Sequence, residues 1–350
     1  MGRRVLITGL SSFWGGRVAE ALEADPDVDV IVGLDTKEPS VPLERTEFVR
    51  ADQSYSILSR IVKATQVDTI LHTFLVTDST SVSARHLHEQ NVIGTMNLLA
   101  AAGAAGSSVR QVVVKSSTLV YGSSWQDPTW FREEMPRVGA VRSRVERSLV
   151  EVESYVRDFA EDNPHVTVTL LRFANVVGTD IATPITRALQ LPLAPCILGF
   201  DPLFQFVEED DVVRSIEFVT QAGLPGIYNV AGDGRLPWSE VAAICGKRLA
   251  PMPPVATEWA AAPLARLNVE LPQELLDLLR YGRGVDNRRL KAAGFVYRYT
   301  SAGAVSNFAR AVRLQKAVGT RRPTYTYEQD VEQFFRHSPA IVREPSGNVT

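Results

Sequence analysis

The sequence predicts an α/β protein built on a doubly wound parallel sheet. Short apolar runs typical of strands alternate with amphipathic helical patterns. The first run leads through a glycine turn into a helix. The expected strands are residues 4–8, 28–34, 47–50, 69–73, 111–116, 166–172 and 226–230. The expected helices include residues 55–65, 86–103 and 145–161.

After residue 172 the alternation is interrupted by two clusters of prolines, at residues 184–202 and 251–272. This change predicts a smaller, Pro-rich C-terminal substrate lobe beside the sheet domain. The expected boundaries are 1–175 plus 206–232 for the sheet domain, 176–205 plus 233–338 for the lobe, and 339–350 for a frayed tail.

The first strand, turn and helix predict a dinucleotide site. Gly9 allows a tight turn after the strand, and a helix N-terminus that follows such a turn binds a pyrophosphate. Asp35 ends the second strand 20 residues after Gly15, where a carboxylate accepts hydrogen bonds from ribose hydroxyls. An acid there repels a 2′-phosphate, which favours NAD over NADP. The alternative is that Gly9 only makes a turn and Asp35 only ends a strand.

The turn is irregular because Ser12 stands where a glycine would let the backbone approach phosphate. Its glycines are Gly9, Gly15 and Gly16. The hydroxyls of Ser11 and Ser12 would either donate to the phosphate or crowd it. Both alternatives stay open at this point.

The composition indicates a globular protein of enzyme size. The chain has 350 residues, is 45% hydrophobic and has a formal charge of −3, so no basic surface for nucleic acid is expected. No apolar run is long enough to span a membrane. The chain begins directly with the first strand, and we expect a cytoplasmic protein. Cys196 and Cys245 lie far apart in apolar surroundings, so neither a disulfide nor a metal site is expected.

Further landmarks follow the glycine turn in a fixed order. They are Asp52, Leu71-His72, Asn91-Val-Ile-Gly-Thr95, Val113-Val-Lys-Ser-Ser-Thr-Leu-Val-Tyr-Gly122, Leu170-Leu-Arg-Phe-Ala-Asn-Val-Val-Gly178, Phe206-Val-Glu-Glu-Asp-Asp211 and Tyr228-Asn229. Together they resemble the extended short-chain dehydrogenase/reductase family, in its branch of NAD-dependent epimerases and dehydratases that includes UDP-galactose 4-epimerases. The resemblance covers about residues 4–310. It implies a Rossmann fold, NAD, a nucleotide sugar or related alcohol as substrate, and a homodimer formed by the long helices beginning near His86 and Val145.

The resemblance also implies roles for individual residues. Asp52 would touch the adenine, and Asn91 would support the active-site helix, although Asp52 could instead cap a helix and Asn91 hold a helix kink. Ser117 would hydrogen-bond the reacting hydroxyl. The full expected cofactor set is Gly9, Ser11, Ser12, Phe13, Trp14, Gly15, Asp35, Asp52, Thr73, Phe74, Asn91 and Ser116.

The base of this family is absent. The family uses Tyr-x-x-x-Lys on a helix, where the ammonium lowers the pKa of the phenol. With Glu153 matched to the family's helix glutamate, Val145 and Leu149 occupy the tyrosine and lysine positions. Neither side chain can move a proton. The titratable candidates for a replacement near the strand ends are Tyr121, His72, His86 and His88, and Tyr325 or Tyr327 from the tail is a further possibility.

The substrate side departs from the family too. Phe204 stands where an arginine usually meets the diphosphate, and Phe204 and Phe206 would form an apolar lip. Asn175 is retained at a position that often contacts substrate. Arg280 or Arg283 could supply positive charge, or simply lie on a solvated surface.

Three functions follow. The first is an NAD-dependent enzyme of the epimerase/dehydratase type that works by transient hydride transfer with a substituted base. The second is a pseudoenzyme that binds NAD and serves as a redox sensor or scaffold. The third is a dehydrogenase of larger apolar alcohols such as sterols; the apolar lip of Phe204 and Phe206 allows it, although family members of that kind also keep Tyr-x-x-x-Lys.

Overall fold

A computed structural model describes residues 2–255, 271–318 and 331–342. Its centre is a parallel sheet of seven strands in the order β12-β7-β5-β4-β1-β2-β3. The strands are β1 (Arg3–Thr8), β2 (Val28–Asp35), β3 (Thr46–Arg50), β4 (Thr69–His72), β5 (Gln111–Ser117), β7 (Thr167–Phe173) and β12 (Gly226–Val230). All seven expected strands are confirmed, each within one residue of its expected ends. The chain runs outward from β1 in both directions, so the sheet is doubly wound and its switch point lies between β1 and β4.

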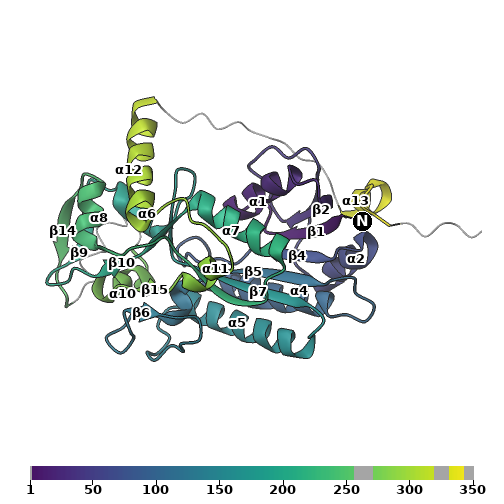
Figure 1. Cartoon of the computed structure of the whole chain (residues 1–350), viewed down its shortest axis with the longest axis horizontal. Helices are drawn as coiled ribbons and strands as arrows, with labels where there is room; N and C mark the ends of the chain where they lie inside the picture. Colours follow the sequence, from purple (N-terminus) through teal and green to yellow (C-terminus); the bar gives the residue numbers. More distant parts are fainter. Residues whose placement is uncertain (1, 256–270, 319–330, 343–350) are drawn as a thin grey trace, which may run out of the picture.

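Helices cover both faces of the sheet (Figure 1). One face carries α1 (Phe13–Glu23) and α7 (Glu209–Ala222), and the other carries α2 (Tyr55–Thr65), α4 (Gly94–Ala102) and α5 (Arg144–Asp162). Strand β1 shows why two cores form. Val5 and Ile7 pack with α1 and α7, whereas Leu6 packs with α2, α4 and α5, because successive side chains of a strand point to opposite faces.

The expected helix at residues 86–103 is divided into three parts. The chain forms α3 (Ala84–His88), a π-helical segment (Glu89–Ile93) and α4. Asn91 lies in the π-helical segment, so the helix irregularity considered for this residue is present.

Away from the sheet lies a separate apolar core in which Phe204, Phe206 and Trp238 pack together, and we call the elements around this core the second lobe. Its helices are α6 (Pro184–Gln190), α8 (Trp238–Ile244), α10 (Gln273–Tyr281) and α12 (Ser301–Val318). Its paired strands are β9 (Leu193–Ile197) with β14 (Arg248–Met252), and β10 (Leu203–Phe204) with β13 (Leu236–Pro237). There are two further short strand pairs, β8 (Asn175–Val177) with β11 (Phe206–Glu208) and β6 (Trp130–Phe131) with β15 (Gly284–Val285). Helix α11 (Arg288–Ala292) contacts β12.

The end of the described chain differs from the expected boundaries. Helix α13 (Val331–His337) lies beside β3, and Phe334 joins the core under α2, not the core of the second lobe. Residues beyond it are packed: Arg4 donates to the carbonyl of Ala340 at 2.6 Å, and the amide of Val342 donates to the carbonyl of Ala64 at 2.7 Å. Buried apolar side chains hold this segment on the sheet domain. Residues 343–350 lie outside the described part, and the remaining boundaries stay a prediction.

Within the described ranges, no helix combines the length and the apolar character needed to cross a bilayer. In the same ranges, no three His, Cys, Asp or Glu side chains converge in an arrangement suited to a metal ion. Cys196 and Cys245 are free thiols.

Candidate active site

A cavity of about 440 Å³ opens at the carboxyl ends of the central strands. Its walls come from the turn before α1, the segments after β4 and β7, the end of β5, and the second lobe, including α10. This is the switch point of the sheet, where ligands bind in open α/β folds. The cavity is therefore the candidate active site.

The glycine turn is closely packed. Gly9 has φ of +83°, and a Cβ atom there would meet the Cα of Phe74 at 2.7 Å. A Cβ on Gly15 would meet the carbonyl oxygen of Gly9 at 2.1 Å. Ser12 caps α1: its hydroxyl donates to the carbonyl of Gly9 at 2.6 Å and accepts from the amide of Gly15 at 3.1 Å. The Ser12 hydroxyl is thus committed to closing the turn, and its proton is not directed at a phosphate.

Asp35 is buried at the end of β2 and accepts three backbone amides. Oδ2 accepts from Ser11 at 3.0 Å, and Oδ1 accepts from Thr36 at 2.7 Å and Lys37 at 3.2 Å. A carboxylate has about four acceptor positions, so about one remains for a ribose hydroxyl. Ser11 contributes its amide to this arrangement. Asp52 is exposed and accepts from the amide of Ser54 at 3.1 Å, a turn contact just before α2; the N-cap of that helix is Ser54, so neither the capping role nor the adenine contact of Asp52 is observed.

Two expected cofactor residues have structural contacts. Asn91 is fully buried; it accepts from the amide of Val76 at 2.8 Å and donates to the Val76 carbonyl at 2.9 Å and to the Ser148 hydroxyl at 3.0 Å. It therefore joins the loop after β4 to α5, as expected of a support for that helix. Ser116 borders the cavity, but its hydroxyl donates to Glu153 at 2.7 Å. The amide of Asn91 and the proton of Ser116 are thus used inside the protein, and a direct contact of either side chain with the cofactor stays a prediction.

The positions of the missing base are apolar core. Val145 and Leu149 on α5 have no exposed surface and pack in the cluster that contains Tyr121 and Phe131. The face of α5 that would carry the family's tyrosine and lysine thus holds no proton-transfer group at these two positions.

Tyr121 does not fit the part of a replacement base. Its hydroxyl donates to Asn229 at 2.8 Å and accepts from Arg172 at 2.7 Å, and its ring stacks on Phe131 at 4.6 Å. Burial raises the pKa of this phenol, which is opposite to what a base needs. The expectation for Tyr121 is corrected because the residue is part of a buried polar network and not of the cavity wall.

The histidines do not meet the cavity either. His72 is fully buried, with Nδ1 at 2.7 Å from the Thr8 hydroxyl and Nε2 at 2.9 Å from the Thr95 hydroxyl. His86 and His88 are exposed on α3. Tyr325 and Tyr327 lie outside the described residues.

His72 predicts a pH dependence of stability. Burial, with the charge of Lys115 as a smaller cause, lowers the pKa of His72 to about 3. The folded chain keeps this imidazole neutral, whereas the unfolded chain protonates it below about pH 6.5. The contribution of His72 to the free energy of unfolding is therefore fully present above about pH 6.5, and it decreases by about 1.4 kcal/mol per pH unit as the pH falls toward 3. The free energy of unfolding is measured in urea at pH 7 and at pH 5. Between these two values it should decrease by about 2 kcal/mol less in His72→Gln than in the wild type.

The exposed His165 provides the control for this experiment. His165→Gln should keep the wild-type difference between pH 7 and pH 5. A His72→Gln variant with that same difference would contradict the prediction.

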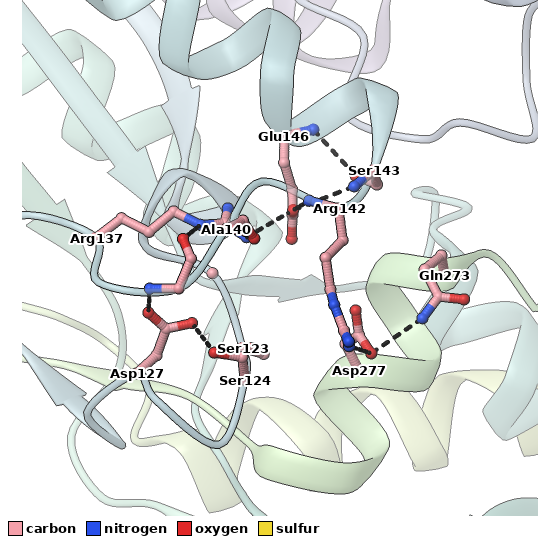
Figure 2. Close-up of polar contacts among 12 residues, drawn as sticks. Ser123, Ser124, Asp127, Arg137, Ala140, Arg142, Ser143, Glu146, Gln273 and Asp277 are labelled. Carbon is pink, nitrogen blue, oxygen red and sulfur yellow. Dashed lines mark hydrogen bonds and ion pairs between the residues drawn. The ribbon is translucent and has the colours of Figure 1, made fainter. Parts of the chain in front are cut away.

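A polar network fixes the segment that leads into α5 (Figure 2). Asp127 accepts from the amide of Gly139 at 2.7 Å, and Arg137 donates to Glu146 at 2.9 Å. Arg142 reaches across to Asp277 of α10 at 3.1 Å. These contacts tie the start of α5 to the second lobe, so they set the position of one cavity wall relative to the sheet.

Three of the expected substrate residues line the cavity. The hydroxyl of Ser117 accepts from the amide of Leu119 at 3.2 Å, and Asn175 donates to the carbonyl of Gln205 at 2.9 Å. Arg283 donates from Nη1 to the Gly122 carbonyl and the Ser123 hydroxyl, both at 3.1 Å. Burial lowers the pKa of Arg283 to about 10.

Two expectations on the substrate side are corrected. Arg280 is not part of the cavity wall; it donates to the carbonyl of Pro254 at 2.8 Å. Phe204 and Phe206 form no lip, because both are fully buried, with the Phe204 ring 4.7 Å from that of Trp238. Their side chains stabilise the second lobe by apolar packing.

The residue that sequence reasoning missed is Lys115. Lys115 is the third residue from the end of β5, its side chain lines the cavity, and the residue is 6% exposed. Its Nζ donates to the carbonyl of Leu75 at 3.1 Å and lies 5.6 Å from the ring of Trp14. Burial lowers the pKa of this ammonium to about 8. The signal in the sequence was a lysine directly after the apolar run Val112-Val-Val114 of a strand expected to be buried.

Comparisons with known proteins agree with this architecture. The model of the NAD dependent epimerase/dehydratase family matches residues 5–231. An uncharacterized protein of Mycobacterium tuberculosis (strain ATCC 25618 / H37Rv) is 32% identical over 326 residues, which cover 91% of this chain and 86% of that protein. The UDP-glucose 4-epimerase of Pasteurella multocida is 28% identical over 187 residues, covering 50% of this chain and 53% of that enzyme.

Solved structures show the same fold. The Thermus thermophilus UDP-glucose 4-epimerase in complex with NAD superposes with a TM-score of 0.67 at 22% identity, over 89% of this chain and 99% of that one. The Thermotoga maritima UDP-glucose 4-epimerase with UDP-glucose gives 0.68 at 17% identity, over the same shares of the two chains. From its match over residues 5–231, this chain belongs to the NAD-dependent epimerase/dehydratase family.

Proposed function

We propose that the protein binds NAD and oxidises a hydroxyl group of a nucleotide sugar, or a related alcohol, by transient hydride transfer. The observation that carries this proposal is one cavity bordered both by the start of α1 and by Ser117, Asn175 and Arg283. The family membership and the fold shared with NAD-complexed nucleotide-sugar enzymes support it.

The residues present fit NAD. Asp35 keeps about one acceptor position for the adenosine ribose, as counted above. The first amides of α1, at Phe13 and Trp14, belong to the helical turn that lacks intrahelical acceptors and suits a pyrophosphate. Thr73 and Phe74 border the cavity where the nicotinamide half would lie. When bound, NAD supplies the hydride acceptor.

The chain's own residues would hold the substrate. The Ser117 hydroxyl can orient the reacting hydroxyl, and Asn175 can add a hydrogen bond to it. Arg283 is a buried cation whose side-chain contacts with Gly122 and Ser123 are to neutral groups. A buried cation held by neutral groups favours an anionic ligand such as a diphosphate.

The test begins with the purified protein. It is denatured, any released dinucleotide is identified by mass, and the intact protein is incubated with UDP-glucose, UDP-galactose and other nucleotide sugars while NADH absorbance is followed. Bound NAD and a sugar-dependent rise in absorbance are expected. A protein that neither releases nor takes up a dinucleotide would contradict the proposal.

A second candidate function has its own observation. Val145 and Leu149 replace the proton-transfer pair with fully buried apolar side chains, which favours an NAD-binding pseudoenzyme acting as redox sensor or scaffold. It predicts NAD binding that raises the melting temperature with no NADH formed from any alcohol. The absorbance assay separates the two functions.

The homodimer is also a proposal. Ile93, which ends the π-helical segment, and Met96, in the first turn of α4, are exposed apolar residues with 42% and 40% of their surface accessible. A hollow beside them is lined by Met96 and Leu99 of α4 and by Tyr155 and Phe159 of α5. A second copy of the chain would cover these surfaces.

Light scattering at micromolar concentration should give twice the mass of one chain. Met96→Arg should give the mass of a single chain, because an arginine at the centre of the contact would have to be desolvated. The exposed Leu314 on α12 provides the control, and Leu314→Arg should remain a dimer. A wild-type protein that scatters as a monomer would exclude this dimer.

A further inference from the structure

The candidate active site contains a buried cation that the proposed function has not used. Lys115 is 6% exposed and borders the cavity, and its Nζ makes one hydrogen bond, to the carbonyl of Leu75. In the described ranges no carboxylate forms an ion pair with it. Of the other lysines whose surroundings the structure describes, none is buried. An ammonium ion in this position bears the cost of desolvation without a counter-ion.

The backbone places Lys115 and Ser117 on the same side of β5. Side chains two residues apart in a strand point to the same face, about 7 Å apart along it. Lys115 and Val113 face the α1 side, where Val113 packs in the core with Trp14. The lysine stem is long enough to cover the distance to a hydroxyl group held by Ser117. Both side chains line the cavity from the same face of β5.

The surroundings leave the amine free to change its protonation. His72 on β4 is a titratable neighbour whose pKa responds to the charge of Lys115, and it stays neutral because burial lowers its pKa to about 3. Asp78 is paired with Arg187 at 2.5 Å, and Glu274 accepts from the Ser79 hydroxyl at 2.5 Å. The remaining charged side chains of the wall are Asp180 and Arg283. Burial lowers the pKa of Lys115 to about 8, so a neutral amine is accessible near physiological pH.

We propose that Lys115 is the acid–base residue of this site, accepting the proton of the substrate hydroxyl that Ser117 orients and returning it on reduction. This inference rests on the proposed function. In the oxidation step the O–H proton passes to the neutral amine of Lys115, and the carbon-bound hydrogen leaves with its electron pair to oxidised nicotinamide. The products are a carbonyl, an ammonium and reduced nicotinamide, so protons and electrons balance. Lys115 thus does from β5 what the tyrosine of the family does from α5.

Two substitutions distinguish a base from a fixed positive charge. Lys115→Arg keeps the charge but cannot give a neutral form, and Lys115→Met removes both. Both should lower the rate of NADH formation by about 10²–10⁴-fold, with the dissociation constant of NAD changed by less than about threefold. The rate of the wild type should rise with pH up to the pKa of Lys115. Lys63→Arg, at an exposed position of α2, should behave as the wild type.

A second readout does not depend on turnover. The protein is labelled at the lysine Cε carbons, and the signal that disappears in Lys115→Arg is titrated by NMR. Its pKa should be at least about one unit lower in the complex with NAD⁺ than in the complex with NADH, because an oxidised nicotinamide held in this cavity would add a positive charge near Nζ.

Each outcome has one meaning. A Lys115→Arg variant with the wild-type rate, or equal titration in the two complexes, overturns the role of Lys115 and leaves the proposed function standing. A wild-type protein that binds no NAD, or binds it and oxidises none of the nucleotide sugars, overturns the proposed function and the base together. Loss of rate in both variants, together with the difference in pKa, establishes the proposal.

Discussion

Replacing Arg172 by methionine is expected to lower the free energy of unfolding by about 3–5 kcal/mol. Arg172 is buried on β7 and donates to both carboxylate oxygens of Glu153, with the shortest contact at 2.5 Å. It also donates to the hydroxyl of Tyr121 at 2.7 Å and to the carbonyl of Glu133 at 3.1 Å. Methionine fills part of the volume but leaves the carboxylate of Glu153 buried without this partner.

Arg157 provides a matched control, since it contacts the same carboxylate from the surface. Its Nη1 lies 3.9 Å from Glu153 Oε2, and its side chain is 50% exposed. Arg157→Met should cost less than about 1 kcal/mol, because exposed ion pairs are weak. The free energies of unfolding are compared in urea at pH 7. Equal losses in the two variants would show that burial of the Arg172 pair does not matter.

A double variant checks the physical reason. Glu153→Gln combined with Arg172→Met removes both charges, so it should be less destabilised than the sum of the two single variants. An additive result would mean that the cost arises from lost packing and not from an unpaired buried charge.

Replacing Gly15 by alanine is expected to weaken NAD binding by about 100-fold or more, or about 2.7 kcal/mol. The new Cβ would lie 2.1 Å from the carbonyl oxygen of Gly9 and 2.8 Å from the Cα of Leu10. These are backbone atoms, so the turn itself must move, and with it the amides at the start of α1. Binding is measured by calorimetry, and unfolding in urea is followed in parallel to separate loss of the site from loss of the fold.

Gly16 is the matched control in the same turn. A Cβ there would first meet Cγ2 of Val41 at 2.8 Å, and this side chain can rotate away. Gly16→Ala should therefore keep NAD affinity within about threefold of the wild type. If Gly15→Ala folds and binds NAD as tightly as Gly16→Ala, the pyrophosphate does not lie at this turn.

Much of the fold could be predicted from local patterns. Apolar strands with a period of two residues and helices with a period of 3.6 are repeated along the chain, so the seven strands of the sheet were expected at their observed positions. The glycine turn and the replacement of the catalytic pair by Val145 and Leu149 were also readable, because backbone freedom and the absence of a proton donor are properties of residue types.

The roles of single polar side chains could not be predicted in this way. Tyr121 and Lys115 lie six residues apart in the same segment, yet the hydroxyl is held by Arg172 and Asn229 in the interior, and the amine borders the cavity. The packing of α13 on the sheet domain was likewise missed. The sequence by itself determined the seven strands of the sheet, the glycine turn and the absence of the family's tyrosine and lysine. Only the tertiary structure decided which polar groups meet, because burial and pairing depend on contacts between segments far apart in the chain.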